Sequence, residues 1–165
     1  FRSPLPRLKQ VKMSQSRSKK ILAIASGGGH WVQLLRLRPA FEGHHVHLVT
    51  TVKGLEYNLD GAMVHIVRDA SRWDKIGLVI MILQLFWLII RLRPRVVITT
   101  GAAPGVVALA IGKLLGARTI WLDSIANAQE LSMSGRAAKH LADLRLTQWP
   151  ELAEENGPFY HGAVL

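Results

Sequence analysis

Short apolar runs bounded by turn residues alternate along the chain with segments in which apolar residues recur every three or four positions. The first pattern is typical of buried strands and the second of helices packed on them. The sequence therefore predicts strands at 21–25, 45–51, 63–67, 95–100, 119–123 and 144–148, and helices at 30–38, 105–115 and 134–141. The segment 54–60 has room for a further short helix.

Strands that alternate with helices at this spacing predict an α/β fold, in which helices cover both faces of a parallel sheet. We expect a Rossmann-like, doubly wound sheet formed by residues 20–165 as one domain, because 165 residues at 49% hydrophobic bury one substantial core. The first twenty residues contain seven Lys or Arg and no acid. We therefore expect 1–19 to be either a solvated basic tail or residual cloning sequence.

Composition and charge exclude several classes of function. The absence of cysteine excludes a disulfide framework, a thiolate zinc site and a cysteine nucleophile. The basic residues are not interleaved with aromatic residues and no recognition motif is present, so a nucleic-acid partner is not predicted. His44, His45 and His47 suggest a metal site, because His45 and His47 would share one face of a strand. No third ligand for that face is evident, and we interpret these histidines as strand-edge residues.

A glycine-rich turn follows the first predicted strand, where doubly wound sheets bind their ligands. Backbone amides at the start of the next helix favour an anion such as a diphosphate, and His30 is the side chain there that can move a proton near neutral pH. A dinucleotide site is disfavoured because Val32 stands where the third glycine is required. The alternative is a turn selected for close packing alone. The candidate site residues are Ser26, Gly27, Gly28, Gly29 and His30.

A second turn rich in small residues follows the strand at 95–100, and a polar segment follows the strand at 119–123. Two small-residue turns at the ends of neighbouring strands predict one crevice between them. For the polar segment, the alternative is an ordinary loop in which Ser132 or Ser134 caps the next helix. The candidate residues of these two segments are Thr100, Gly101, Ala102, Pro104, Asp123, Ser124 and Asn127.

Residues 76–90 are uncharged, and this stretch of about 15 residues is shorter than the ~17 to 25 needed to span a bilayer. The flanking arginines and tryptophans suit a helix near 76–93 that lies in the lipid headgroup region. A crossover helix buried under the sheet explains the same pattern about equally well. The candidate membrane residues are Trp73, Ile80, Leu83, Phe86, Trp87, Arg91 and Arg93.

Several motifs occur in a fixed order: SGGGH, VVITTGAAPGVVALAIGKLLGAR, DSIANAQELSMSGR and LTQWPEL. Together they resemble the acceptor-side subunits of two-part GT-B glycosyltransferases. These are the bacterial PssD/CpsF-type polysaccharide proteins and the membrane-anchoring half of the eukaryotic GlcNAc transferase of N-glycan assembly. The resemblance covers nearly all of residues 20–165 and extends to the N-terminal half of MurG-like enzymes.

The resemblance implies the acceptor-binding subunit of an inverting UDP-sugar glycosyltransferase. It would hold a polyprenyl-diphosphate-linked glycan at the cytoplasmic face of the inner membrane, while a PssE-like partner binds the UDP-sugar. No other cofactor is expected, and no metal is expected because the sequence contains no Asp-X-Asp motif. His30 would be a base or a phosphate contact, Asp123 stands where relatives carry an acid, and Asn127 replaces the arginine usual in eukaryotic subunits. The alternative is a non-catalytic membrane scaffold for a catalytic partner.

The sequence also contains one nucleotide-binding-like half rather than two. A complete GT-B enzyme needs roughly twice this length. We therefore expect the second half to come from a separate chain.

Overall fold

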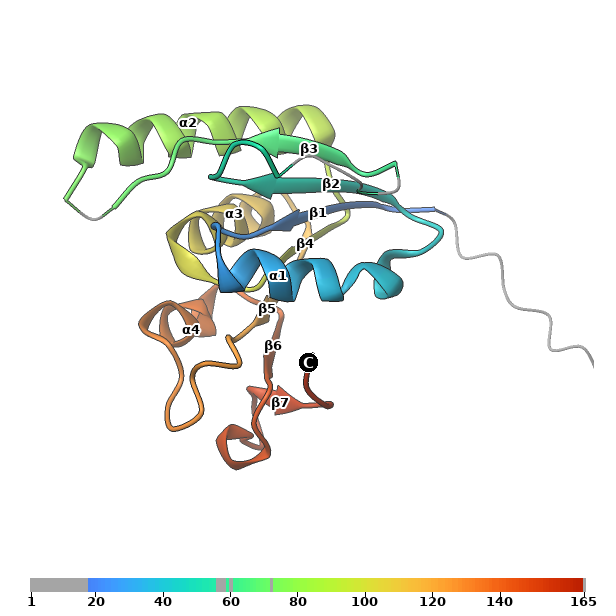
Figure 1. The fold of residues 1–165 in the computed structure, drawn as a ribbon, viewed down its shortest axis with the longest axis vertical. Coiled ribbons are helices and arrows are strands. Elements are labelled where there is room, and N and C mark those ends of the chain that lie inside the picture. Colours follow the sequence, from blue (N-terminus) through green and yellow to red (C-terminus); the bar gives the residue numbers. More distant parts are fainter. Residues whose placement is uncertain (1–17, 56–58, 60, 72, 165) are drawn as a thin grey trace, which may run out of the picture.

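The computed structural model describes residues 18–55, 59, 61–71 and 73–164. Its strands are β1 (Lys20–Ile24), β2 (His45–Thr50), β3 (Met63–Ile66), β4 (Val96–Thr99), β5 (Arg118–Leu122), β6 (Leu144–Thr147) and β7 (Phe159–Tyr160). They form one sheet in the order β3-β2-β1-β4-β5-β6-β7, with every neighbouring pair parallel (Figure 1). The first six strands follow the Rossmann order, which confirms the predicted fold class.

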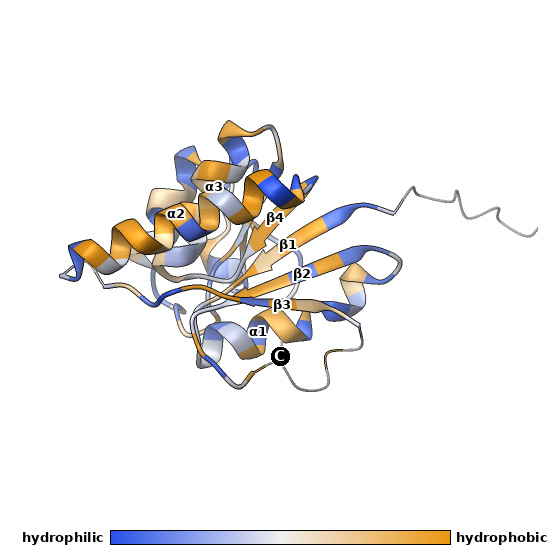
Figure 2. Ribbon diagram, turned by 90° about the horizontal axis from the view of Figure 1, so that it is seen from above, coloured by the Kyte–Doolittle hydropathy of each residue, from blue (hydrophilic) through white to orange (hydrophobic). Residues whose placement is uncertain are grey.

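Helices cover both faces of this sheet. They are α1 (Gly29–Arg36), α2 (Lys75–Leu92), α3 (Ala102–Leu114) and α4 (Met133–Ala137), with short 3₁₀ helices η1 (Arg38–Phe41), η2 (Ala138–His140) and η3 (Pro150–Leu152). Figure 2 shows α2 and α3 on one face of the strands and α1 on the other. Parallel strands need such crossover helices, and both faces of the central strands are consequently buried.

The central strand β1 contributes to a core on each face. Leu22 and Ile24 are fully buried in the core beneath α2 and α3, whereas Ile21 and Ala23 belong to the core beneath α1. This division follows from the period of two along a strand. The turns that leave β1 and β4 are therefore held by two packed helix layers.

Most predicted elements are present with small shifts at their ends. Strand β7 was not predicted, because two residues carry no recognisable alternation. The helix predicted at 134–141 is shorter than expected, because α4 ends at Ala137 and the chain tightens into η2. The helix considered at 54–60 and most of the predicted tail fall largely outside the described residues.

His47 forms a pair with His65 from the neighbouring strand β3. Nδ1 of His47 lies 3.0 Å from Nε2 of His65, and the two rings stack with centroids 5.3 Å apart. Burial lowers the pKa of His47, and the positive charges of His65, Lys20 and His45 lower it further. Burial also lowers the pKa of His65. Among the described residues, no group of three histidine, aspartate or glutamate side chains gathers in a way that suits a metal ion.

This pair predicts that the protein is destabilised by mild acid. The unfolded histidines take up protons as the pH falls through about 6.5, whereas the folded pair takes them up only at lower pH. The free energy of unfolding should therefore fall below pH 6.5 and level off below the folded pKa values. Urea unfolding at pH 7.5 and 5.5 measures this loss. It should be smaller in His65→Gln, and an equal loss in that variant would contradict the assignment.

Candidate functional site

A crevice is expected where the strand order reverses, between the carboxyl ends of β1 and β4. The turn from β1 ends at Gly28, which has φ +67° and precedes α1. The turn from β4 ends at Gly101, which precedes α3. Helices α1 and α3 therefore both begin at this edge of the sheet. Their free amides and dipoles favour an anionic group there.

Two hydrogen bonds join the turns and orient His30. Nδ1 of His30 lies 2.9 Å from the carbonyl oxygen of Thr100, and the Thr100 hydroxyl donates to the His30 carbonyl at 2.7 Å. A carbonyl only accepts, so Nδ1 of His30 carries the proton in this bond. In the neutral ring the lone pair then belongs to Nε2. The geometry provides a histidine of defined tautomer, with Nε2 able to accept a proton.

Gly101 permits this close approach of the two turns. It has φ +142°, and a Cβ atom at this position would lie 2.5 Å from Cε1 of His30. Its amide is bonded to the Thr99 hydroxyl at 3.1 Å. The residue that follows, Ala102, also has a positive φ of 66°. The backbone at Gly101 therefore packs directly against the imidazole ring of His30. The buried Pro104 completes the first turn of α3.

We expect Gly101→Ala to displace His30 as well as to destabilise the fold. The matched control is Gly43→Ala, because Gly43 has φ +76° and a Cβ atom added there would meet no heavy atom within 4 Å. Both positions have a positive φ, so both variants carry a backbone cost, and it is larger at Gly101, because φ 142° with ψ −175° is adopted essentially by glycine alone. Thermal unfolding should show both losses, the larger in Gly101→Ala. NMR signals of the His30 ring should shift in Gly101→Ala alone, because only this added Cβ atom meets the ring. Equal ring signals in both variants would contradict a role for this contact.

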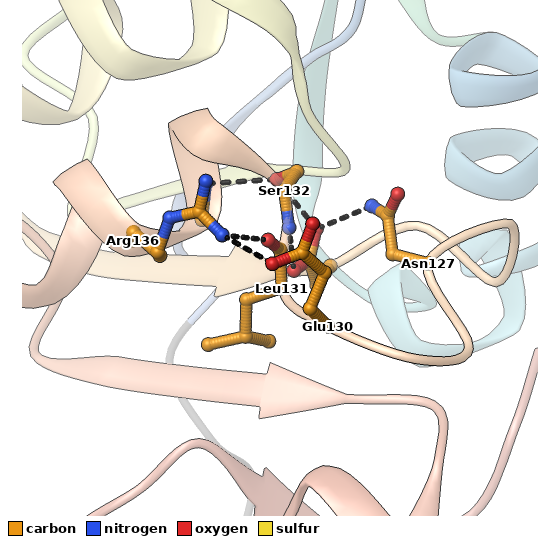
Figure 3. A network of polar contacts seen from close by, with 7 residues as sticks. Asn127, Glu130, Leu131, Ser132 and Arg136 are labelled. Carbon is orange, nitrogen blue, oxygen red and sulfur yellow. Dashed lines mark hydrogen bonds and ion pairs between the residues drawn. The ribbon is translucent and has the colours of Figure 1, made fainter.

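A third loop, from Asp123 to Ser132, follows β5 at the same edge of the sheet (Figure 3). Asp123 is buried, at 2% exposed. It accepts hydrogen bonds from the Ser124 amide, the Asn127 side chain, and both the amide and the hydroxyl of Ser132, at 2.8 to 3.1 Å. In this geometry Asp123 holds the loop in place, and Asn127 serves the same network.

Further polar contacts anchor this loop from both sides. Ser132 is the helix cap, since its hydroxyl accepts from the Gly135 amide at 2.8 Å. Beside it, Arg136 bonds Glu130 at 3.1 Å (Figure 3). Gln148, which the sequence patterns did not single out, is buried and donates to the Asp123 carbonyl at 2.9 Å. Trp149 donates to the Ile125 carbonyl at 2.8 Å, so it also holds this loop in place.

Helix α2 presents a broad apolar surface to solvent. Its inner side is buried on the fold through Gly77, Met81, Leu85, Leu88 and Ile89. Figure 2 shows the hydrophobic colouring along its length. The exposed residues, which we call the outer apolar face, are Ile76, Val79, Ile82, Leu83, Phe86, Trp87 and Ile90, with Trp73 preceding the helix at 86% exposed.

One side of α2 is a crossover packed on the sheet, and the other side is exposed. The buried crossover helix expected from the sequence therefore describes the inner side, and the helix suited to the headgroup region describes the outer side. Of the predicted membrane residues, Ile80 is half-buried, whereas Arg91 and Arg93 are exposed. At 18 residues, α2 is also long and apolar enough to cross a membrane by length and composition. The expectation of a segment too short to span does not hold for the complete helix.

Solved structures with the same architecture include MurG and UDP-N-acetylglucosamine 2-epimerases. MurG of Acinetobacter baumannii superposes with a TM-score of 0.69 at 13% identity, over 88% of this chain and 45% of that structure. UDP-N-acetylglucosamine 2-epimerase of Rickettsia bellii superposes with a TM-score of 0.64 at 14% identity, over 89% of this chain and 45% of that structure. The chain therefore spans about half the length of these proteins and has the fold of one GT-B half.

Sequence comparison narrows this class to a family. The UDP-N-acetylglucosamine transferase subunit ALG14 of Homo sapiens is 29% identical over 185 residues, which cover 90% of this chain and 83% of the human protein. The family described as oligosaccharide biosynthesis protein Alg14 like matches residues 64–164. This chain belongs to the Alg14-like family.

Proposed function

We propose that this chain is the acceptor-binding, membrane-associating subunit of a two-component inverting glycosyltransferase. Its acceptor would be a polyprenyl-diphosphate-linked glycan at the cytoplasmic face of the membrane. A PssE-like partner would bind the UDP-sugar and complete the enzyme. The relatives named as UDP-N-acetylglucosamine transferase subunits make UDP-N-acetylglucosamine the first donor to test.

The observation that carries this proposal is the pairing of His30 with Thr100 between two helix amino ends. The amides that begin α1 and α3 suit the diphosphate of the acceptor. Nε2 of His30 would take the proton of the acceptor hydroxyl while the hydroxyl oxygen attacks the anomeric carbon of the UDP-bound sugar. The bond from that carbon to UDP breaks, UDP leaves with the electron pair, and the anomeric configuration inverts. Asp123 acts as a positioning residue for the loop beside this crevice.

The position of α2 supports delivery of a membrane-bound acceptor. Its first turn, near Trp73 and Ile76, lies toward the carboxyl edge of the sheet, because α2 runs back across the sheet before β4 begins (Figure 1). Lipid contact through the outer apolar face would therefore bring the crevice near the membrane surface. Such a face suits a helix partly immersed in the headgroup region.

Reconstitution tests this function. Sugar transfer from a panel of UDP-sugars to a lipid-diphosphate acceptor is measured with this chain alone, with its PssE-like partner alone, and with both. We expect transfer only by the pair. Transfer by the partner alone, at an unchanged rate and at high acceptor concentration, would make this chain a membrane scaffold. No transfer by any combination would overturn the proposed reaction.

A further inference from the structure

A cavity of about 600 Å³ lies at the amino edge of the sheet, at the opposite end from the crevice. It opens between the last turns of α2 and α3, next to the segments that enter β4 and β5. Its apolar walls include Ile89, Ile90, Leu115 and Ala117. Arg93 and Arg95 line the same cavity, and both reach solvent. Apolar walls beside two guanidinium groups suit a ligand that is both apolar and anionic.

The sequence around the cavity has more cations than acids. Residues 75–122 contain no Asp or Glu but include six cations: Lys75, Arg91, Arg93, Arg95, Lys113 and Arg118. Of these, Lys113 is paired with Asp143 at 3.3 Å. Toward other described residues, the side chains of Arg93 and Arg95 form no hydrogen bond or ion pair. The carboxyl ends of α2 and α3 each contribute roughly half a negative charge. Three full positive charges, on Arg91, Arg93 and Arg95, exceed that contribution, so the local field attracts anions.

The backbone of Arg93 gives an independent indication that this side chain has a role. Arg93 is the carboxyl-terminal cap residue of α2 and has φ +47°, and its amide donates to the Ile89 carbonyl at 2.8 Å. Glycine is the usual residue in this left-handed conformation, because a Cβ atom is unfavourable there. Strain of this kind is commonly retained at functional positions.

The cavity is continuous with the outer apolar face of α2. Ile90 belongs to both, being 40% exposed on the helix and a wall of the cavity. One turn earlier, Trp87 has its ring centroid 5.1 Å from the guanidinium of Arg91. On the α3 side, Leu114 is 80% exposed beside the cavity residue Leu115. A lipid headgroup in the cavity would therefore have its acyl chains along surfaces that are already apolar.

We propose that this cavity binds the phosphate of an anionic membrane phospholipid through Arg93 and Arg95, with the acyl chains against Ile90, Leu114 and Leu115. The proposal rests on the membrane association of α2 proposed above and adds a discrete headgroup site to it. This site lies at the far end of α2 from the crevice. A lipid held there would give the domain a second fixed contact with the bilayer.

Vesicle flotation of the full chain tests the site. Phosphatidylcholine vesicles are compared with vesicles of phosphatidylcholine mixed with phosphatidylglycerol. We expect Arg93→Gly and Arg95→Gln each to lower partitioning onto the anionic vesicles by roughly fivefold and to leave partitioning onto neutral vesicles unchanged. Arg93→Gly should also raise the unfolding temperature, since glycine relieves the left-handed backbone. Weaker binding by a more stable protein cannot be attributed to misfolding.

The matched control is Arg118→Gln, which removes a nearby exposed charge that does not line the cavity. It should change anionic binding by less than the two cavity variants. Equal losses in all three variants would indicate diffuse attraction and overturn the site. Saturable binding of glycerol phosphate in the absence of vesicles, as tight as the binding of the lipid, would also overturn the proposal that the ligand is a membrane phospholipid. If the wild-type chain does not bind neutral vesicles, this result would instead contradict the proposed contact of α2 with the membrane.

Discussion

Replacement of His30 by alanine should lower the kcat of the reconstituted pair by roughly 10²- to 10⁴-fold, the usual contribution of a general base. The variant loses the Nε2 lone pair that the bond to Thr100 leaves available. It loses a single side-chain hydrogen bond, so about 1 kcal/mol of stability is at stake. Steady-state transfer to the lipid-diphosphate acceptor, with thermal unfolding measured in parallel, separates these two effects.

His30→Asn is the informative companion variant. The asparagine amide can still donate to the Thr100 carbonyl, but it cannot accept the proton of the acceptor hydroxyl. Turnover should therefore stay low in His30→Asn, while the unfolding temperature approaches that of the wild-type chain. Recovery of turnover by asparagine would show that His30 holds the two turns together and that another group removes the proton.

The double variant Leu83→Glu/Trp87→Glu should partition at least about 100-fold less onto phosphatidylcholine vesicles. Leu83 and Trp87 are each 60% exposed on the outer apolar face of α2. Burial of such a side chain is worth about 1.5–3 kcal/mol, so two contribute at least about 3 kcal/mol, or roughly 10²-fold in partitioning. Flotation measures this loss. Turnover on a long-chain lipid acceptor should fall with it, while turnover on a short-chain, water-soluble acceptor is retained.

Val32→Glu is the matched control for this experiment. Val32 is 49% exposed, but it belongs to α1 on the opposite face of the sheet. Its replacement should leave flotation unchanged. Equal flotation of the double variant and the wild-type chain would contradict membrane contact through the outer apolar face, and the lipid surface would have to be sought on another element.

Local patterns were sufficient to predict the sheet and the meeting of the turns that leave β1 and β4. Each strand from β1 to β6 is a short run of mostly apolar residues, and each turn that leaves β1 or β4 contains glycine. Once the strands are known to be parallel, their carboxyl ends must share one edge. The pattern alone therefore predicts that residues as distant as Ser26 and Thr100 lie at one edge of the sheet. Strand β7, with two residues, carried too little pattern to be predicted.

Helix α2 shows most clearly where sequence patterns are insufficient. Because it is apolar nearly all round, no periodicity distinguishes the side packed on the sheet from the side left exposed. The fold decides this, through the packing of Met81 and Leu85 on the sheet and on α3. Asp123 is a similar case, since its burial among Ser124, Asn127 and Ser132 depends on how the loop folds back.

The positions of the strands along the chain, the glycine-rich turns, His30 and the apolar character of α2 are all local properties, and the sequence determined them. Contacts between segments far apart in the chain depend on how elements pack, and the tertiary structure alone decided them. These include the bond that leaves Nε2 of His30 free, the exposed side of α2, and the cavity that Arg93 and Leu115 both line. The physical reason is that burial and hydrogen bonding are set by neighbours in space, which a one-dimensional pattern does not specify.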